Sequence, residues 1–250
     1  FFGSGSAKAV RDHFSPGVQI RLIAAMNVLA HTDNVNDFLS EVVNLMDSDT
    51  VFISQSHWLV SLIEKFEFDT IYHEHLRYYT LESLTELFNR HGLHINDVEA
   101  NDFYGGSIRV SASLHESEIE SVGLKAIRTA ETQLDVVQAV GAMKQQLLKN
   151  KAQLLQLLVQ LKEDGKRTIG VGAPMKASTL LNYYGISSDL VECIGEVNQL
   201  KIGTVVPGAR IPVVDEAILF NNSPDYALLL SCLLYTSDAA DERSSVDLGG

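Results

Sequence analysis

Apolar and polar positions in the first half of the chain switch between a strand pattern and a helix pattern. Two apolar runs bounded by polar residues predict buried strands of a parallel sheet covered on both faces. Apolar side chains at helical spacing predict the helices between and after them. Two further strands around Gly105-Gly106 are close enough to form an antiparallel hairpin. In order, we expect a strand at 20–31, a helix at 34–46, a strand at 50–56, helices at 58–66 and 81–92, and strands at 93–100 and 106–113.

The second half begins with a long helical pattern and returns to alternating elements. Residues 117–164 carry apolar stripes at helical spacing, with Gly141 as a candidate kink or break. A second α/β unit follows, with strands at 167–173, 190–198 and 225–230 and helices at 174–185 and 215–220. Alternation of strands and helices predicts an α/β fold with mostly parallel sheets.

We expect four segments along the chain. They are an α/β domain at 1–115, a helical connector at 116–165, a second α/β domain at 166–230 and a non-native tail at 231–250. The tail is set apart because its composition turns abruptly to Ser, Asp, Ala and Gly, which resembles translated adaptor sequence. The chain begins without an initiator Met and without a signal-peptide pattern.

Composition narrows the classes of function. Hydrophobic residues make up 46% of the chain and charged residues 20%, as in ordinary globular proteins. The formal net charge of −13 argues against nucleic acid as a partner, because phosphate contacts need a basic face. No apolar run is long enough to predict a membrane span. Cys193 and Cys232 match no zinc spacing, which favours a reducing, cytoplasmic location. We expect a monomer.

The segment "DTIYHEHLRYY", residues 69–79, places four proton-carrying side chains together: Tyr72, His73, Glu74 and His75. A metal site would need a third and fourth ligand that the neighbouring sequence does not offer, so we expect no metal. Imidazole titrates near neutrality, and an adjacent carboxylate can orient it for acid–base chemistry. From these residues alone, a catalytic loop and a polar loop stay about equally supported.

His31 follows the first predicted strand, at the end where open α/β sheets bind their ligands. His75 could meet it there, although a capping or surface histidine is slightly favoured by this position alone. Further along, "GVGAP" at 170–174 puts a glycine turn between a strand and a helix, and Lys176 adds a charge. Such a turn can hold a phosphate, but the third glycine of a dinucleotide fingerprint is absent, so tight strand–helix packing is equally supported.

The segment "KIGTVVPGAR" carries Lys201 and Arg210 around two glycines. It could bind an anion or form an exposed turn.

Five blocks then occur in a characteristic order: "MNVLAHTDNVNDFL", "EKFEFDTIYHEHLRYYTLESLTELFNRHGL", "YGGSIRV", "GVGAPMKASTLLNYYGI" and "KIGTVVPGARIPV". Over residues 18–230 the chain resembles the S-adenosylmethionine-dependent C-methyltransferases of nucleotide-activated deoxysugars, the group that includes the dTDP-sugar C-3 methyltransferases.

This resemblance implies a fold and an organisation. Members resemble three modules: a small N-terminal zinc domain, a methyltransferase domain with a Rossmann-like sheet, and a C-terminal Rossmann-like domain. The zinc cysteines and the glycine-rich donor loop are not seen here, so the chain is expected to be an N-terminally truncated fragment, inactive alone. The cofactor implied is S-adenosylmethionine, with zinc only in the missing module. The partner implied is a nucleotide-diphosphate deoxysugar.

The resemblance also implies roles for matching residues. His75 would remove a proton from the sugar carbon next to a keto group, Tyr72 and Glu74 would stabilise the enolate and orient the base, and His31 would assist from the opposite wall. The remaining assignments are Asn27, Val28 and Leu29 beside the methyl donor, Gly105, Gly106 and Ser107 beside the sugar, and Gly172, Lys176, Lys201 and Arg210 on the diphosphate.

One residue departs from the family pattern: Arg77 stands where a small residue is usual after "HEHL". It could alter sugar choice, contact the diphosphate or point to solvent. Two other functions stay open. One is a nucleotide-sugar-binding module without catalysis, and the other is a nicotinamide-dependent oxidoreductase that uses the glycine turn at 170–174.

Overall fold

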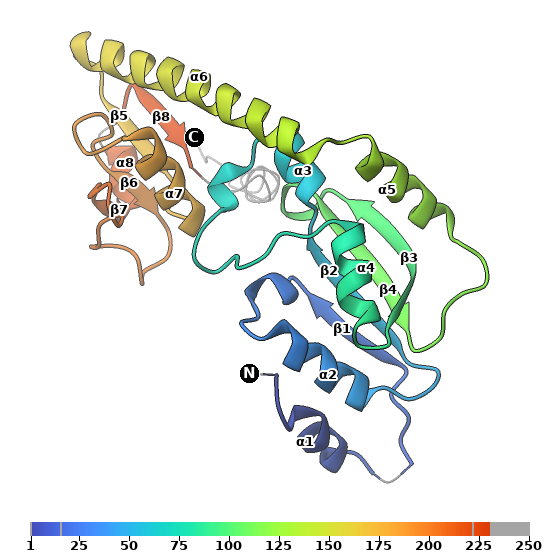
Figure 1. Cartoon of the computed structure of the whole chain (residues 1–250). Coiled ribbons are helices and arrows are strands. Elements are labelled where there is room, and N and C mark those ends of the chain that lie inside the picture. Colours follow the sequence, from blue (N-terminus) through green and yellow to red (C-terminus); the bar gives the residue numbers. More distant parts are fainter. Residues whose placement is uncertain (1, 16, 222, 231–250) are drawn as a thin grey trace, which may run out of the picture. The chain divides into compact units, whose positions relative to one another are not determined.

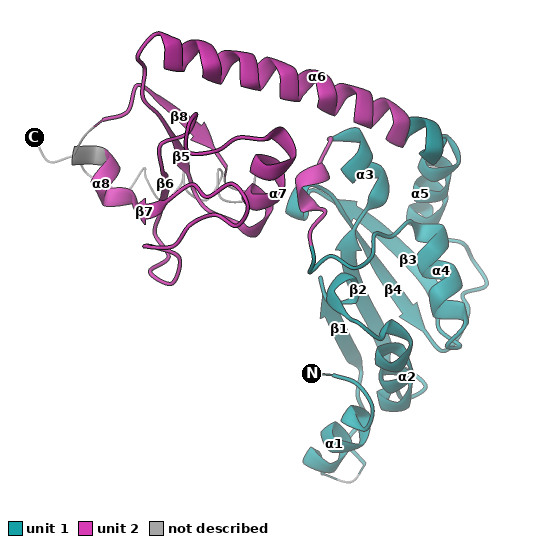
Figure 2. Cartoon of the chain, turned by 60° about the vertical axis from the view of Figure 1, so that its left-hand side comes forward, with its two compact units in different colours: residues 1–65, 73–139 teal, residues 66–72, 140–250 magenta. Residues whose placement is uncertain are grey.

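The computed structural model describes residues 2–15, 17–221 and 223–230. The chain forms two compact units (Figure 2). Unit 1 contains residues 1–65 and 73–139, and unit 2 contains residues 66–72 and 140–250. The border therefore falls inside a long helix, and a short stretch that ends on Tyr72, the first residue of the "YHEH" motif, belongs to unit 2. The expected tail at 231–250 lies outside the described residues.

Unit 1 is built on a four-stranded sheet with strand order β1-β2-β4-β3 (Figure 1). β1 (Leu22–Met26) and β2 (Val51–His57) run parallel, while β4 (Ser107–Ser113) pairs antiparallel with both β2 and β3 (His94–Asn101). The parallel pair and the terminal hairpin confirm the prediction from the apolar pattern. Because β1 and β2 are parallel, their carboxyl ends meet at one edge of the sheet.

Helices cover one face of this sheet. They are α2 (Val35–Leu45), α4 (Leu81–Asn89) and α5 (Val122–Thr132), whose apolar stripes form one core with β2 and β4. α3 (Leu59–Glu64) follows β2 directly. The expectation that both faces are covered is wrong for the described chain. Leu22 is 57% exposed and Met26 45% exposed on the other face of β1.

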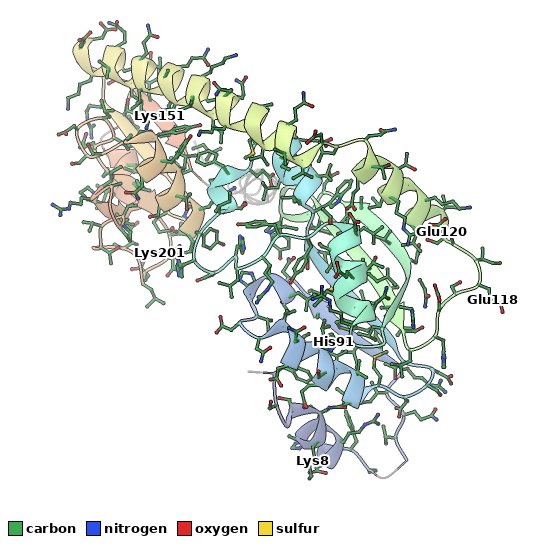
Figure 3. All side chains as sticks on the ribbon, in the orientation of Figure 1. Lys8, His91, Glu118, Glu120, Lys151 and Lys201 are labelled. Atoms are coloured by element: carbon green, nitrogen blue, oxygen red, sulfur yellow. The ribbon has the colours of Figure 1, made fainter. Side chains whose placement is uncertain are left out.

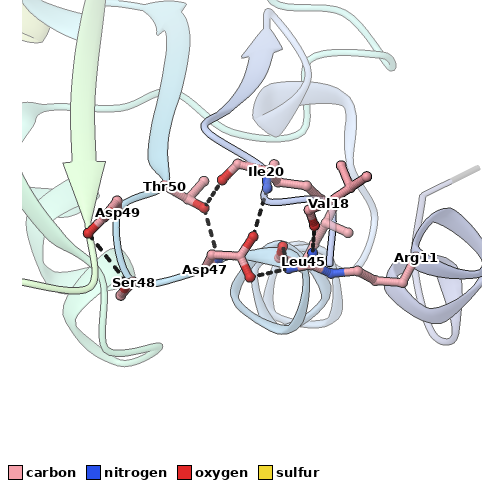
Figure 4. A network of polar contacts seen from close by, with 8 residues as sticks. All are labelled: Arg11, Val18, Ile20, Leu45, Asp47, Ser48, Asp49 and Thr50. Atoms are coloured by element: carbon pink, nitrogen blue, oxygen red, sulfur yellow. Dashed lines mark hydrogen bonds and ion pairs between the residues drawn. The ribbon is translucent and has the colours of Figure 1, made fainter. Parts of the chain in front are cut away.

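A polar network ties an unpredicted helix, α1 (Ser6–His13), to unit 1 (Figure 4). Arg11 donates to the carbonyl of Leu45 at 2.6 Å and to Asp47 at 2.9 Å, and Asp47 also accepts from the backbone N–H of Ile20 at 2.7 Å. The hydrogen bond from Arg11 and then that from Ile20 hold the pKa of Asp47 below its ordinary value. This network fixes the entry into β1.

Unit 2 is a second α/β unit with an all-parallel sheet, in the order β7-β6-β5-β8. The strands are β5 (Thr168–Val171), β6 (Ile194–Glu196), β7 (Val213–Asp215) and β8 (Tyr226–Leu229), and the short helices are α7 (Met175–Tyr184) and α8 (Glu216–Asn221). Leu158 of the long helix α6 (Val136–Glu163) packs into the same core. The helix runs through Gly141, so the expected break lies instead between α5 and α6.

Candidate active site at the strand ends of unit 1

Two histidines lie at the carboxyl ends of the parallel strands. β1 leads through Asn27 into a short 3-10 helix, η1 (Leu29–His31), which ends on His31. His57 is the last residue of β2. The sequence predicted His31 but missed His57, because the strand was read only as far as residue 56. The rule that identified His31, a histidine at the end of a parallel strand, applies equally to His57.

His75 joins these two histidines. The centroid of its ring lies 4.8 Å from that of His31 and 5.0 Å from that of His57, with interplanar angles of 58° and 73°. Two tyrosines extend the cluster edge-on: Tyr78 at 6.2 Å from His75 and Tyr104 at 6.0 Å from His57. The predicted meeting of His31 and His75 is confirmed, and aromatic rings surround it.

Backbone and guanidinium contacts hold the His75 segment against the η1 loop. The N–H of Leu76 donates to the carbonyl of Ala30 at 2.9 Å. Arg77 donates to the carbonyl of Thr32 and, at 2.8 Å, to that of Asp33. Arg77 therefore holds the His75 segment against the loop after η1 inside unit 1. Its charge and five donors suit two neighbouring carbonyls, which a small residue could not reach.

A carboxylate from α5 secures the other end of this segment. Glu131 accepts from the indole N–H of Trp58 at 2.8 Å and from the backbone N–H of Leu81 at 2.6 Å. Leu81 is the first residue of α4, and Thr80 caps this helix through reciprocal hydrogen bonds with Ser83. Helix starts leave backbone donors without intrahelical partners, so these oxygens satisfy groups that would otherwise be unpaired.

Tyr79 lies in the core beneath the site. It is 5% exposed, and its hydroxyl donates to the carbonyl of Leu29 at 3.4 Å. Burial raises the pKa of Tyr79 to about 12, although the nearby charge of Arg77 acts in the opposite direction. A phenol held in this state keeps its proton at neutral pH, so Tyr79 supports the loop and is not a candidate base.

Two other predicted members of the motif are Glu74 and Tyr72. Glu74 lies 3.9 Å from the Nε2 atom of His73, and both side chains are at least half exposed. The expected role of Glu74 in orienting His75 stays a prediction. Tyr72 belongs to the stretch 66–72 of unit 2, where its backbone N–H donates to the carbonyl of Thr70. Its role beside the base stays a prediction.

The three residues expected beside the methyl donor differ in their surroundings. Asn27 has a positive φ of 54°, and its Oδ1 atom is buried with no hydrogen-bond partner in the part of the chain that the structure describes. A buried unpaired oxygen is costly, and here it lies where β1 ends. Val28 is partly buried. Leu29 is fully buried in the core, so a contact with the donor would come from its backbone, and its place beside the donor stays a prediction.

The glycine turn of unit 1 is shaped by its own packing. A Cβ at Gly106 would lie 2.4 Å from the Cβ of Ser61 on α3, and the φ of Gly106 is 146°. The carbonyl of Gly105 accepts from Lys65 at 2.5 Å. Ser107 is fully buried and donates to the carbonyl of Phe103 at 2.9 Å. The side chain of Ser107, the first residue of β4, is thus engaged within unit 1, and contact of a sugar with the backbone of Gly105, Gly106 and Ser107 stays a prediction.

The glycine turn of unit 2 already holds an anion from its own chain. Glu196, at the end of β6, accepts from the backbone N–H groups of Ala173 at 3.0 Å, Val197 at 2.9 Å and Asn198 at 3.1 Å. Burial acts to raise the pKa of Glu196, but these donors and the charge of Lys201 outweigh it, so the pKa lies below its ordinary value. Glu196 therefore stays charged where a phosphate was expected.

Of the three predicted cations of unit 2, two are paired within the unit and one is exposed. Lys201, labelled in Figure 3, projects from unit 2. It donates to the carbonyl of Ala173 at 2.8 Å and lies 3.7 Å from Glu196. Lys176 pairs at 3.3 Å with Asp69, and both side chains are less than a fifth exposed. Arg210 is exposed, with a positive φ of 56°. The two lysines are thus engaged inside unit 2, and Arg210 is the predicted cation at its surface.

Two kinds of site were sought over the whole described chain. Within the described residues, no group of three or more His, Cys, Asp or Glu side chains is arranged to hold a metal ion. None of the described helices combines the length and the apolarity that crossing a bilayer requires.

A family model described as the C-methyltransferase C-terminal domain matches residues 102–250, more than half of the chain. This chain belongs to the C-methyltransferase family. A curated relative, C-methyltransferase NovU of Streptomyces niveus, is 32% identical over 233 residues, which is 92% of this chain and 56% of NovU. This C-methyltransferase chain therefore spans about half the length of that relative.

Solved structures give only weak likenesses to this C-methyltransferase chain. LepI in complex with SAM is 13% identical with a TM-score of 0.34, over 45% of this chain and 34% of LepI. Magnesium protoporphyrin IX methyltransferase (ChlM) from Synechocystis PCC 6803 with bound SAH is 16% identical with a TM-score of 0.30, over 40% of this chain and 47% of ChlM. These scores are too low to assign a ligand or a detailed fold.

Proposed function

We propose that the protein transfers a methyl group from S-adenosylmethionine to a carbon of a nucleotide-activated keto-deoxysugar, with His75 as the base. The observation that carries this proposal is the placing of the His75 ring against His31 and His57, at the carboxyl ends of β1 and β2. Membership of the C-methyltransferase family supports the reaction type. Over its matched region, the similarity to NovU supports a carbon atom as the acceptor.

The chemistry requires a base at this position. A carbon next to a keto group becomes nucleophilic only when its proton is removed, and the C–H electron pair then forms the enolate. His75 takes that proton on a ring nitrogen. S-adenosylmethionine supplies the methyl group: the carbon's electron pair forms the new C–C bond, and the electrons of the broken C–S bond stay on sulfur.

Asn27 is the residue best suited to the donor. Its buried Oδ1 lacks a partner among the described residues and lies at the end of β1, close along the chain to His31. A ligand that donates a hydrogen bond there would relieve the cost of that unpaired oxygen. Val28 follows in the same loop as a lesser contact. The Oδ1 atom of Asn27 therefore supports a donor site at the end of β1.

Hydrogen-bond donors for the enolate oxygen come from the same region. His31 is exposed and faces the His75 ring, so it is our candidate for stabilising the developing oxyanion. Tyr72 remains a second candidate from the sequence. Gly105 and Gly106 form the proposed sugar-facing turn. For the nucleotide diphosphate we retain Arg210, because the ammonium groups of Lys176 and Lys201 already have carboxylate partners and Glu196 already occupies the turn at Gly172. We propose a cytoplasmic location, in keeping with its cysteine pattern.

The test uses the full-length protein that contains this chain and follows methyl transfer from labelled S-adenosylmethionine to dTDP-4-keto-6-deoxyglucose, a probe of the proposed substrate class. His75→Gln should lower the rate by about 10²–10⁴-fold, the usual contribution of a general base, and leave donor affinity unchanged. His73→Gln, two residues away and exposed, is the matched control and should stay near wild type. Full activity of His75→Gln would overturn the assignment. Nucleotide-sugar binding by the wild type without any transfer would favour a binding module.

A further inference from the structure

His57 has a fixed position beside the proposed base. It ends β2, where its backbone stands opposite Ser107 of β4. The next N–H, that of Trp58, donates to the carbonyl of Gly106 at 3.1 Å. The pairing with Ser107 and the bond to Gly106, both on the β4 side of β2, hold the backbone of His57 in place. A ring attached here is a rigid reference point for its neighbours.

His75, by contrast, lies in a segment without regular structure. Residues 73–78 form a turn and an extended stretch between the helices η2 (Phe68–Thr70) and α4. The backbone bond of Leu76 and the guanidinium of Arg77 locate the segment, but they do not define the rotation of the His75 ring. Ring rotation must come from side-chain contacts, and a base has to be aligned with the proton that it removes.

The geometry of His57 suits that task. Its ring meets the His75 ring nearly at right angles, at 73°, with the centroids 5.0 Å apart. Edge-to-face contact is a preferred arrangement of aromatic rings and fixes the relative rotation of both. Tyr104 packs edge-on against His57 at 6.0 Å and 87°, which gives the His57 ring a second aromatic contact.

We propose that His57 is a positioning residue that holds the His75 imidazole in its reactive orientation through ring-to-ring contact. The inference rests on the proposed function of His75 as base. It commits to the ring of His57 as the working part and not to its nitrogen atoms. His57 therefore acts through His75 and does not itself exchange a proton with the sugar.

Three substitutions separate the ring from the nitrogens. His57→Phe keeps an aromatic ring without nitrogen, His57→Asn keeps a polar nitrogen without a ring, and His57→Ala removes both. We expect His57→Phe to retain kcat within about threefold, and His57→Asn and His57→Ala to lower kcat by about tenfold or more with KM nearly unchanged, as for a loss of alignment. His115→Phe, at the opposite end of β4 and exposed, is the matched control.

A second measurement does not depend on turnover. Ring resonances of His75, recorded by NMR with 13C- and 15N-labelled histidine, should keep their wild-type positions in His57→Phe and shift or broaden in His57→Ala. Unchanged resonances and unchanged kcat in His57→Ala would overturn the inference. Activity that survives in His57→Asn and disappears in His57→Phe would also overturn it, because the nitrogen would then be the working part.

The two proposals fail in different ways. A wild-type protein that transfers no methyl group to any keto-sugar probe removes the proposed function. The NMR comparison still decides whether His57 orients His75 in that case. A wild-type protein that transfers methyl groups, together with a fully active His57→Ala, removes only the inference on His57.

Discussion

Both units have parallel strands whose carboxyl ends meet at one edge of a sheet, but the side chains at the two edges differ. In unit 1 the carboxyl ends of β1 and β2 carry imidazole rings and one buried oxygen without a partner among the described residues. In unit 2 the carboxyl ends of β5 and β6 carry a carboxylate that accepts from three backbone N–H groups and lies beside a lysine. At the first edge the Oδ1 atom of Asn27 has no hydrogen-bond partner among the described residues, whereas at the second edge Glu196 is bonded by its own chain.

This difference shows when a glycine turn at a strand end can bind an anion. Gly172, with a φ of 80°, has the backbone freedom of a phosphate-binding turn. The donor that would face a phosphate, the N–H of Ala173, is nevertheless bonded to Glu196. A fixed carboxylate repels a second anion, so glycine at a strand end predicts an anion site only when the donors remain available.

Glu196→Gln tests whether the edge of unit 2 is held by its carboxylate. The amide cannot accept from all three backbone N–H groups, and Lys201 loses its carboxylate partner. We expect a loss of about 1–3 kcal/mol in the free energy of unfolding, measured by denaturant titration, with faster amide hydrogen exchange at Val197 and Asn198. Glu192→Gln is the control, because its pair with Arg167 is more exposed and contributes about 0–1 kcal/mol.

The same carboxylate gives a pH dependence. The pKa of Glu196 is below its ordinary value of 4.5 in the folded protein, so its stabilising effect is fully present above that value. The effect disappears as pH falls through the lowered folded pKa. In Glu196→Gln, this part of the acid sensitivity should be missing. Equal acid sensitivity in both proteins would show that Glu196 does not hold this edge together.

Arg77→Leu tests the fastening of His75 in unit 1. The carbonyls of Thr32 and Asp33 lose their donor, and the His75 segment becomes free to move away from His31. We expect methyl transfer to fall by about ten- to a hundredfold, with Arg77→Lys intermediate because an ammonium cannot span both carbonyls equally well. Arg90→Leu, at an exposed helix position, is the control. A change confined to substrate affinity would instead make Arg77 a ligand contact.

Asn27→Gly tests the unpaired oxygen at the end of β1. Glycine accepts the positive φ of this residue, so the fold should tolerate the change, while the amide is lost. We expect the affinity for S-adenosylmethionine, measured by calorimetry, to fall about tenfold, the value of one hydrogen bond. An unchanged affinity with unchanged thermal stability would remove Asn27 from the donor site.

The pair of Lys176 and Asp69 gives the smallest expected effect. A double-mutant cycle with Lys176→Met and Asp69→Asn should show a coupling of about 0.5–1 kcal/mol in unfolding, since both side chains are only partly exposed. Nucleotide-sugar affinity should be the same in all four proteins. A loss of affinity wherever Lys176 is replaced would restore it as a diphosphate ligand and weaken the contrast between the two units.

Periodicity predicted the strands and most helices because each element has one apolar face. The parallel pair of β1 and β2 and the hairpin after Gly106 follow from local spacing alone. Helix α1 was missed because its short pattern has little apolar content, and it is held by Arg11 and Asp47 across the sequence. Contacts of this kind depend on tertiary structure and leave no local pattern.

The site shows the same limit. His31 and His75 could be predicted, since each stands beside a recognisable motif, and the structure brings their rings together. His57 carries the same signal at a strand end but lies outside any motif. The partners of Glu74, Lys176 and Lys201 could not be predicted, because ion pairs join residues by distance in space, and the sequence indicates only their charges.

The central claim is that His75 removes the proton next to the keto group. Its most direct test is proton exchange in D2O, followed by 1H NMR on dTDP-4-keto-6-deoxyglucose with S-adenosylhomocysteine in place of the methyl donor. The account predicts that the wild-type protein replaces the proton next to the keto group by deuterium and that His75→Gln does so at the uncatalysed rate. Exchange at the wild-type rate in His75→Gln would contradict the account.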